Sequence, residues 1–251
     1  MTRLLCLFFL FVSASSFAIT NIENQRLNNT TPGTKGNISF TLDGEVSETD
    51  EFTLGSAITF IRSYSKDEWI VLLNREYSEV DDEVNTDETL LHVRHLTKHN
   101  AHWGHEVFTQ YEEDLFSDLA KRSLIGAGMR YTLDANPELK TANHFGLGLF
   151  YEDEEYADTI IEDNEQNVRL NIYWSYRNNL TDNMKYTSTL YFQPDVKALD
   201  DDKGLWQNAV TISVTSTISL SVTWNVIYDN HAPDGEEDSE VNYKSLIIYN
   251  F

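Results

Sequence analysis

Apolar and polar residues alternate along most of the chain from Gly36 onward. In the stretch 217–228, the even-numbered residues from Ile218 to Tyr228 are apolar or aromatic, and the residues between them up to Asn225 are Ser, Thr and Asn. A period of two is typical of β-strands, because successive side chains leave a strand on opposite faces. The pattern predicts an all-β chain with twelve strands, over residues 37–46, 51–62, 68–78, 87–97, 102–112, 121–133, 142–152, 166–178, 183–193, 205–215, 217–228 and 240–251.

These stretches are longer than the strands of about five or six residues that are usual in soluble proteins. A strand tilted by about 45° needs about nine to eleven residues to cross a bilayer. In an outer-membrane barrel the apolar face meets lipid and the polar face lines the interior, whereas in a secreted soluble β-sandwich the polar face meets water. Alternation alone leaves both architectures open. The strand lengths and the even strand count favour a closed antiparallel transmembrane β-barrel over residues 37–251.

The first 36 residues show no such alternation. Residues 1–18, "MTRLLCLFFLFVSASSFA", contain Arg3, an apolar run over 4–12 and a small-residue end, which together indicate a secretory signal peptide. Residues 19–36 are rich in Asn and Thr and are expected to form a flexible periplasmic leader. The single cysteine, Cys6, lies in the signal segment, so the mature chain is expected to have no disulfide, thiolate metal site or cysteine nucleophile.

The chain is acidic, with a formal net charge of −23 at pH 7, which argues against a nucleic-acid partner. Alternate connections between the predicted strands hold 32 of the 41 acidic residues, in segments 45–51, 79–88, 112–118, 152–165, 195–202 and 229–240. These connections are also the longer set, and long outer loops with short periplasmic turns are typical of outer-membrane barrels. The acidic rim is expected to be solvated or to bind divalent cations, which would bridge it to lipopolysaccharide phosphates; no other cofactor is expected.

The chain ends "NYKSLIIYNF", with aromatic residues in one register of the final strand. We expect this strand to pair with the first, since closing the sheet removes its edges and pairs every backbone polar group in the bilayer. The ending resembles the terminal signature of bacterial outer-membrane proteins, represented here by Tyr249 and Phe251, which the barrel-assembly machinery reads. The expected location is the outer membrane of a Gram-negative bacterium, and the expected partners are its lipid, lipopolysaccharide and that machinery.

Three long segments resemble one known family. They are "FTQYEEDLFSDLAKRSLIGAGMRYTL" (108–133), "FGLGLFYEDEEY" (145–156) and "WQNAVTISVTSTISLSVTWNVIYDNHAPDGEEDSEVNYKSLIIYNF" (206–251). They are similar to the YdiY-like family of salt-induced outer-membrane proteins, catalogued as a domain of unknown function. The resemblance spans most of 37–251 and implies an outer-membrane barrel. It implies no particular activity and identifies no functional residues.

The polar faces of the predicted strands place a set of charged residues in the barrel interior. Six are basic and three are acidic: Arg94, Arg130, Arg169, Arg177, Lys185, Lys244, Asp43, Glu76 and Glu106. One interpretation is a network of salt bridges and hydrogen bonds that fills the barrel. The other is a narrow water-filled path that favours anions, since rings of basic residues line anion pores.

Histidine and serine residues raise two further possibilities, a metal site and a hydrolytic site. Five of the seven histidines lie between residues 92 and 105, and His95, His99, His102 and His105 are weak candidates for a zinc or copper site. A polar interfacial turn is the alternative.

The chain contains no G-x-S-x-G motif, and a Ser–His pair must lie within hydrogen-bonding reach to act. We therefore expect a structural protein or a narrow passive pore, with an outer-membrane lipid-modifying enzyme as the alternative.

Overall fold

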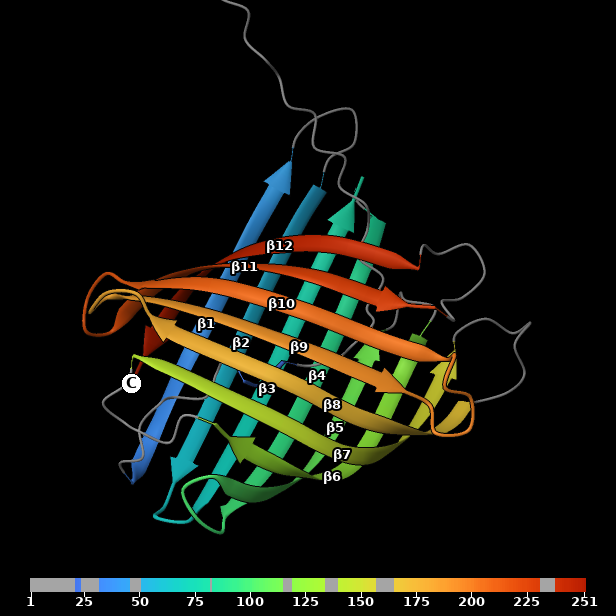
Figure 1. The fold of residues 1–251 in the computed structure, drawn as a ribbon. Helices are drawn as coiled ribbons and strands as arrows, with labels where there is room; N and C mark the ends of the chain where they lie inside the picture. Colours follow the sequence, from blue (N-terminus) through green and yellow to red (C-terminus); the bar gives the residue numbers. More distant parts are fainter. Residues whose placement is uncertain are drawn as a thin grey trace, which may run out of the picture.

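The computed structural model describes residues 21–23, 32–45, 51–81, 83–114, 119–133, 140–156, 165–230 and 238–251, so the predicted signal peptide lies outside the described residues. The described chain forms twelve strands (Figure 1). These are β1 (Gly33–Glu45), β2 (Glu51–Ser63), β3 (Asp67–Val80), β4 (Glu83–Lys98), β5 (Trp103–Asp114), β6 (Leu119–Thr132), β7 (Thr141–Tyr156), β8 (Glu165–Asn179), β9 (Met184–Pro194), β10 (Asp202–Ser213), β11 (Ile218–Asp229) and β12 (Ser239–Asn250).

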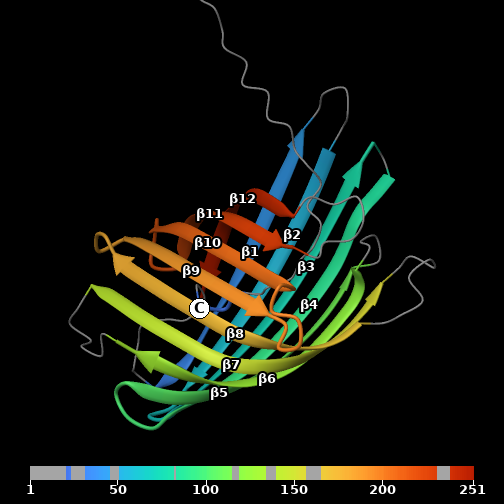
Figure 2. The same ribbon diagram turned by 45° about the vertical axis from the view of Figure 1, so that its right-hand side comes forward.

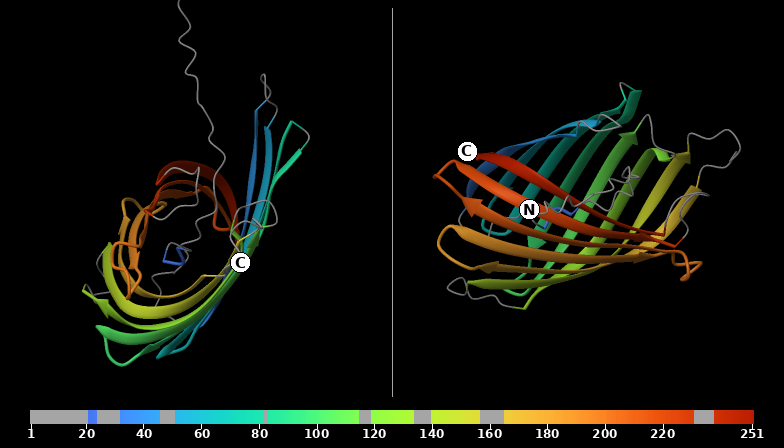
Figure 3. Two further views of the ribbon diagram at one scale, coloured as in Figure 1. Left: turned by 90° about the vertical axis from the view of Figure 1, so that its right-hand side faces the viewer. Right: turned by 90° about the horizontal axis from the view of Figure 1, so that it is seen from above.

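Each strand pairs antiparallel with its neighbour in sequence, and β1 pairs with β12 to close the barrel. The closing seam runs from the pair Asn37–Asn250 to the pair Phe40–Ile247. It is extended by two backbone hydrogen bonds of 3.0 Å between Gly36 and Phe251. The predicted closure by the last strand is confirmed, and the closed sheet surrounds the interior laterally (Figures 2 and 3).

All twelve predicted strands are present, and their bounds differ from the predicted ones by at most four residues. β7 continues four residues beyond the predicted end at residue 152, and β4 begins four residues before the predicted start at 87. Both ends lie in the acidic segments 79–88 and 152–165, which are predicted as connections. β1 begins at Gly33, inside the segment 19–36 that had been expected to be a flexible leader.

The outer surface of the barrel carries the apolar register of the strands. Along β11, Leu220, Val222 and Trp224 are exposed, whereas Ser219 and Ser221 are buried towards the interior. Exposed aromatic side chains lie near both ends of the strands: Trp69, Trp103, Phe145, Tyr249 and Phe251 near one end, and Phe52, Tyr111, Tyr151, Trp206 and Tyr228 near the other. Such girdles mark the two membrane interfaces of an outer-membrane barrel. Within the described residues, no helix has the length and apolarity to cross a membrane.

The short turns and the chain end Phe251 lie at one end of the barrel, which corresponds to the periplasmic end in the usual outer-membrane arrangement. The buried side chains lie inside the barrel rather than between sheets. Two small apolar groups, Phe108–Leu124–Phe150 and Tyr173–Tyr191–Leu205, project inward from β5–β10. The described interior is therefore partly filled.

Candidate functional site: the barrel interior

The interior contains an elongated cavity of about 1230 Å³. At its periplasmic end it is bordered by the turns 181–183 and 216–217, and it extends to Thr86 and Glu88 towards the outer end of β4. Its wall comes from β1–β4 and β8–β12, so the cavity runs along one side of the barrel. The opposite side, formed by β5–β8, carries many buried side chains on its inner face, among them Phe108, Arg122, Glu152 and Arg169, and we call it the filled side.

Hydroxyl and amide side chains line much of this cavity. Examples are Asn37, Thr41, Thr187, Ser221, Thr223 and Asn242. Lys244 of β12 forms an ion pair with Glu76 of β3, and Lys185 of β9 also faces the cavity. Because the wall offers hydrogen-bond donors and acceptors with few charges, it suits water and small polar solutes better than apolar ones.

The outer part of the filled side contains five buried charged residues that form ion pairs with one another. They are Arg122, Glu152, Glu154, Arg169 and Lys203, and we call them the outer ion cluster. Glu152 accepts a hydrogen bond of 3.0 Å from Nε of Arg122 and contacts Nε of Arg169. Glu154 lies 3.1 Å from Nε of Arg122 and 2.9 Å from Nζ of Lys203. Every charge in the cluster therefore has an opposite charge beside it, which burial in a barrel interior requires.

The outer ion cluster links strands across the interior. Arg122 comes from β6, both glutamates come from β7, Arg169 comes from β8 and Lys203 comes from β10. Arg169 also pairs with Asp201 at 2.8 Å. Since the cluster holds four strands in register, it stiffens this wall of the barrel.

Nearer the periplasmic end, a second network is centred on Tyr173 of β8. Its hydroxyl group donates a hydrogen bond of 2.9 Å to Glu106 and accepts one of 2.8 Å from Arg130. Glu106 also pairs with Arg94 at 3.1 Å. Arg130 makes a further ion pair of 2.6 Å with Glu23, which lies in the N-terminal segment rather than in the barrel wall.

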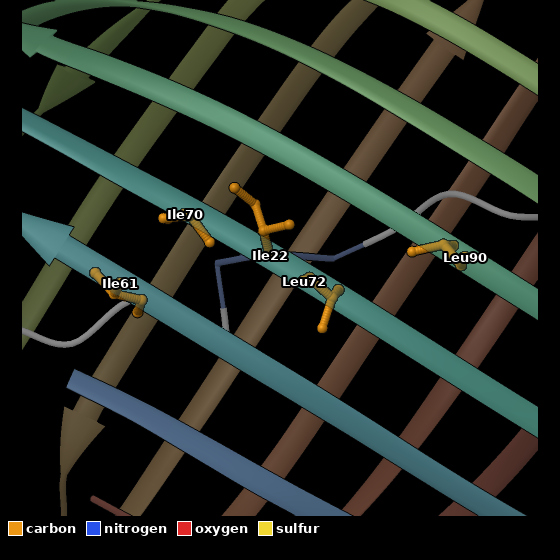
Figure 4. Packing of buried hydrophobic residues seen from close by; sticks show 5 residues of the cluster. All are labelled: Ile22, Ile61, Ile70, Leu72 and Leu90. Atoms are coloured by element: carbon orange, nitrogen blue, oxygen red, sulfur yellow. The ribbon is translucent and has the colours of Figure 1, made fainter. Parts of the chain in front are cut away.

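The segment Asn21–Glu23 lies inside the barrel (Figure 3). Ile22 is 0 % exposed and packs in one cluster with Ile61, Ile70, Leu72 and Leu90 of β2–β4 (Figure 4). The expectation of a flexible leader over 19–36 is wrong for the residues that the structure describes there. Residues 21–23 are buried in the lumen and 33–36 belong to β1.

The structure places the predicted interior residues as follows. Glu76, Lys185 and Lys244 line the cavity, and Arg94, Glu106, Arg130 and Arg169 belong to the two charged networks. Arg177 is half-buried on the same register of β8 as Tyr173. Asp43 belongs to β1, but its side chain lies outside the described part of the chain.

The interior also contains charged residues that were not predicted. Among the described side chains these are Arg122, Lys203, Glu23, Glu68, Glu112, Glu152, Glu154, Asp195 and Asp229, all buried. Seven of these nine are acidic. The expected excess of basic over acidic side chains is therefore not found over the whole described interior.

The four candidate histidines are divided among separate contacts near the periplasmic turn. His99 and His105 approach each other, with 2.9 Å between ring nitrogens. His95 pairs with Asp67 at 3.3 Å, and His102 contacts the carbonyl oxygen of Thr132 at 2.8 Å. Within the described ranges, no group of three or more potential ligands is placed to hold a metal ion.

Much of the acidic rim that is a candidate site for divalent cations, including 46–50, 157–164 and 231–237, lies outside the described ranges.

Comparisons with known proteins agree with this architecture. Residues 38–251 match a family model described as "Protein of unknown function, DUF481". Among curated proteins, no sequence is significantly similar.

Three solved structures illustrate the likeness of fold. An outer-membrane channel from Pseudomonas putida F1 has a TM-score of 0.54 at 10% identity, covering 87% of this chain and 94% of that one. The NanC porin has a TM-score of 0.52 at 9% identity, covering 86% and 98%. The translocator domain of the autotransporter NalP from Neisseria meningitidis has a TM-score of 0.52 at 11% identity, covering 88% of each chain. The chain belongs to the DUF481 family and is a twelve-stranded outer-membrane β-barrel.

Proposed function

We propose that the protein is a narrow passive pore for small polar solutes. The observation that carries this proposal is the polar cavity of about 1230 Å³, which extends from the periplasmic turns towards the outer end of β4. A barrel with a purely structural role has no need of a polar passage along one side. In this proposal the outer ion cluster keeps the filled side rigid, and solutes move along the other side.

The fold comparisons support a pore, because porins are among the structures of similar fold. Structures of similar fold include the NanC porin and the KdgM porin in complex with oligogalacturonate, with TM-scores of 0.52 and 0.50. As a pore, the protein would bind solutes weakly and carry out no reaction. Its acidic outer loops would contact lipopolysaccharide through divalent cations, and Tyr249 and Phe251 would be read during barrel assembly.

A bulky side chain in the cavity is expected to block the pore. Ser221 lines the cavity from β11 and is 5 % exposed, so a Ser221→Trp variant should lose most of its single-channel conductance in planar bilayers. The matched control is Val222→Trp, since the adjacent Val222 side chain faces the outside of the barrel. Equal conductance of the two variants and the unchanged protein would show that solutes do not pass through this cavity.

A further inference from the structure

We propose that the segment Asn21–Glu23 is a plug that the inner wall of the barrel binds, and that its release widens the pore and shifts its preference towards anions. This inference rests on the proposed pore function. It assigns a binding site to the lumen wall and names its occupant, which is a segment of the same chain.

The first observation is a patch of apolar side chains on the inner wall, where polar side chains are expected. We call this patch, formed by Ile61, Ile70, Leu72 and Leu90, the socket. Inward-facing side chains of a water-filled barrel are polar as a rule. Here Ile61 and Ile70 face inward together with Leu72 and Leu90, and Ile22 covers them (Figure 4). Without Ile22 this patch would face the cavity, which Leu72 already borders. The hydrophobic effect therefore holds the segment on the wall.

The second observation is that polar contacts fix the segment on either side of Ile22. Asn21 donates a hydrogen bond of 2.8 Å from its Nδ2 to Oε1 of Gln207 on β10. Glu23 pairs with Arg130 on β6 at 2.6 Å. The socket on β2–β4, Gln207 on β10 and Arg130 on β6 lie on three different parts of the closed wall. The segment thus crosses the lumen rather than lying along one strand, and Asn21 borders the cavity.

The third observation concerns charge. Glu23 places one negative charge among basic side chains of the inner wall. Glu23 pairs with Arg130 and also attracts the positive charge of Arg177. Arg177 in turn repels the positive charge of Lys185, which lines the cavity. Release of the segment removes this negative charge from the neighbourhood of three positive ones. Because basic residues along a pore favour anions, release should change selectivity as well as width.

The direct experiment locks the segment in place with a disulfide. Ile22→Cys and Leu72→Cys are combined in a Cys6→Ser background, so that these are the only cysteines of the chain. Residues 22 and 72 belong to the same buried cluster, so the two thiols should be joined by oxidation or, where a disulfide does not reach, by a short reducible thiol-specific cross-linker. We expect low conductance in planar bilayers when the protein is oxidised and a larger conductance after reduction. The Ile22→Cys single variant should not respond to reduction.

A charge variant tests selectivity separately. Glu23→Gln keeps the shape of the segment but removes its charge, and we expect its reversal potential in a chloride salt gradient to shift towards the anion value. Glu155→Gln serves as the control, because it also removes one carboxylate charge, but Glu155 pairs with Lys121 and is not among the described residues that line the cavity. An equal shift in both variants, or no shift in Glu23→Gln, would overturn the assigned role of Glu23.

The outcomes separate this inference from the pore function itself. Failure of the two cysteines to cross-link in a folded barrel would overturn the plug, whatever the conductance. Cross-linking with the same conductance before and after reduction would overturn the plug and leave the pore intact. If no variant conducts, including the reduced double-cysteine protein, the pore is refuted and the plug with it.

Discussion

Replacing Glu152 with Gln is expected to lower the free energy of unfolding by about 3–5 kcal/mol, the usual cost of breaking a buried ion pair by removing one partner. Glu152 is fully buried and contacts both Arg122 and Arg169. A neutral amide has nearly the same size but cannot balance two guanidinium groups. Its NH₂ group would also point a donor at side chains that have only donors.

The measurement is urea unfolding of the refolded protein in lipid vesicles, followed by tryptophan fluorescence. Glu155→Gln is the matched control, because Glu155 lies three residues further along β7 and forms a partly exposed pair of 2.8 Å with Lys121. Loss of an exposed pair should cost less than about 1 kcal/mol. Similar losses in the two variants would mean that the outer ion cluster does not stabilise the barrel.

Placing an arginine on the outer face of β11 is expected to be almost as damaging. Val222 is 49 % exposed and lies near the middle of the strand, between the two aromatic girdles. A Val222→Arg variant would hold a charge in hydrocarbon, at a cost of about 2–4 kcal/mol near the bilayer midplane. The variant should unfold at lower urea concentration and insert poorly into vesicles.

Ser221→Arg provides the comparison, since the adjacent Ser221 side chain faces the polar cavity. An arginine there can remain hydrated, so its effect on the free energy of unfolding should be much smaller than that of Val222→Arg. If the order of the two effects were reversed, the assignment of lipid-facing and lumen-facing registers would be wrong.

The strands and their two faces could be predicted from the sequence because alternation is a local property. It placed Arg94, Arg130 and Arg169 on the inner register without any knowledge of their neighbours. Their partners could not be predicted in the same way, since each pair depends on the register and tilt of strands far apart in sequence. The pair Arg130–Glu23, for example, joins residues 107 positions apart.

Glu152 and Glu154 were missed for a different reason. Their segment was assigned to an acidic outer loop on composition, although both continue the register of Phe150 on β7. Arg122 likewise shares the register of Arg130 on β6. The period-two signal thus continues through both glutamates, whereas Arg122 lies within the predicted strand 121–133 and was left out of the predicted interior set.

The plug segment left only an indirect signal in the sequence. Residues 69–73, "WIVLL", are apolar on both registers, which indicates that the inner face of β3 needs an apolar cover. Nothing in the composition of 19–36 identifies Ile22 as that cover, because the apolar residues Ile19, Ile22 and Leu27 of this polar segment show no regular alternation. The filling network is found among the buried charged residues of β5–β8, and a polar cavity lies on the other side of the barrel. Passage of solutes through that cavity stays a prediction.

The central claim is that the apolar register faces lipid and the polar register faces a water-accessible interior. Single cysteines at successive positions 218–225 of β11, in a Cys6→Ser background, can be spin-labelled in vesicles and tested for collisions with oxygen and with a water-soluble nickel complex. We expect oxygen accessibility to peak at the even positions and nickel accessibility at the odd ones. Even positions shielded from both reagents would show that these side chains are packed inside protein, which would contradict the barrel.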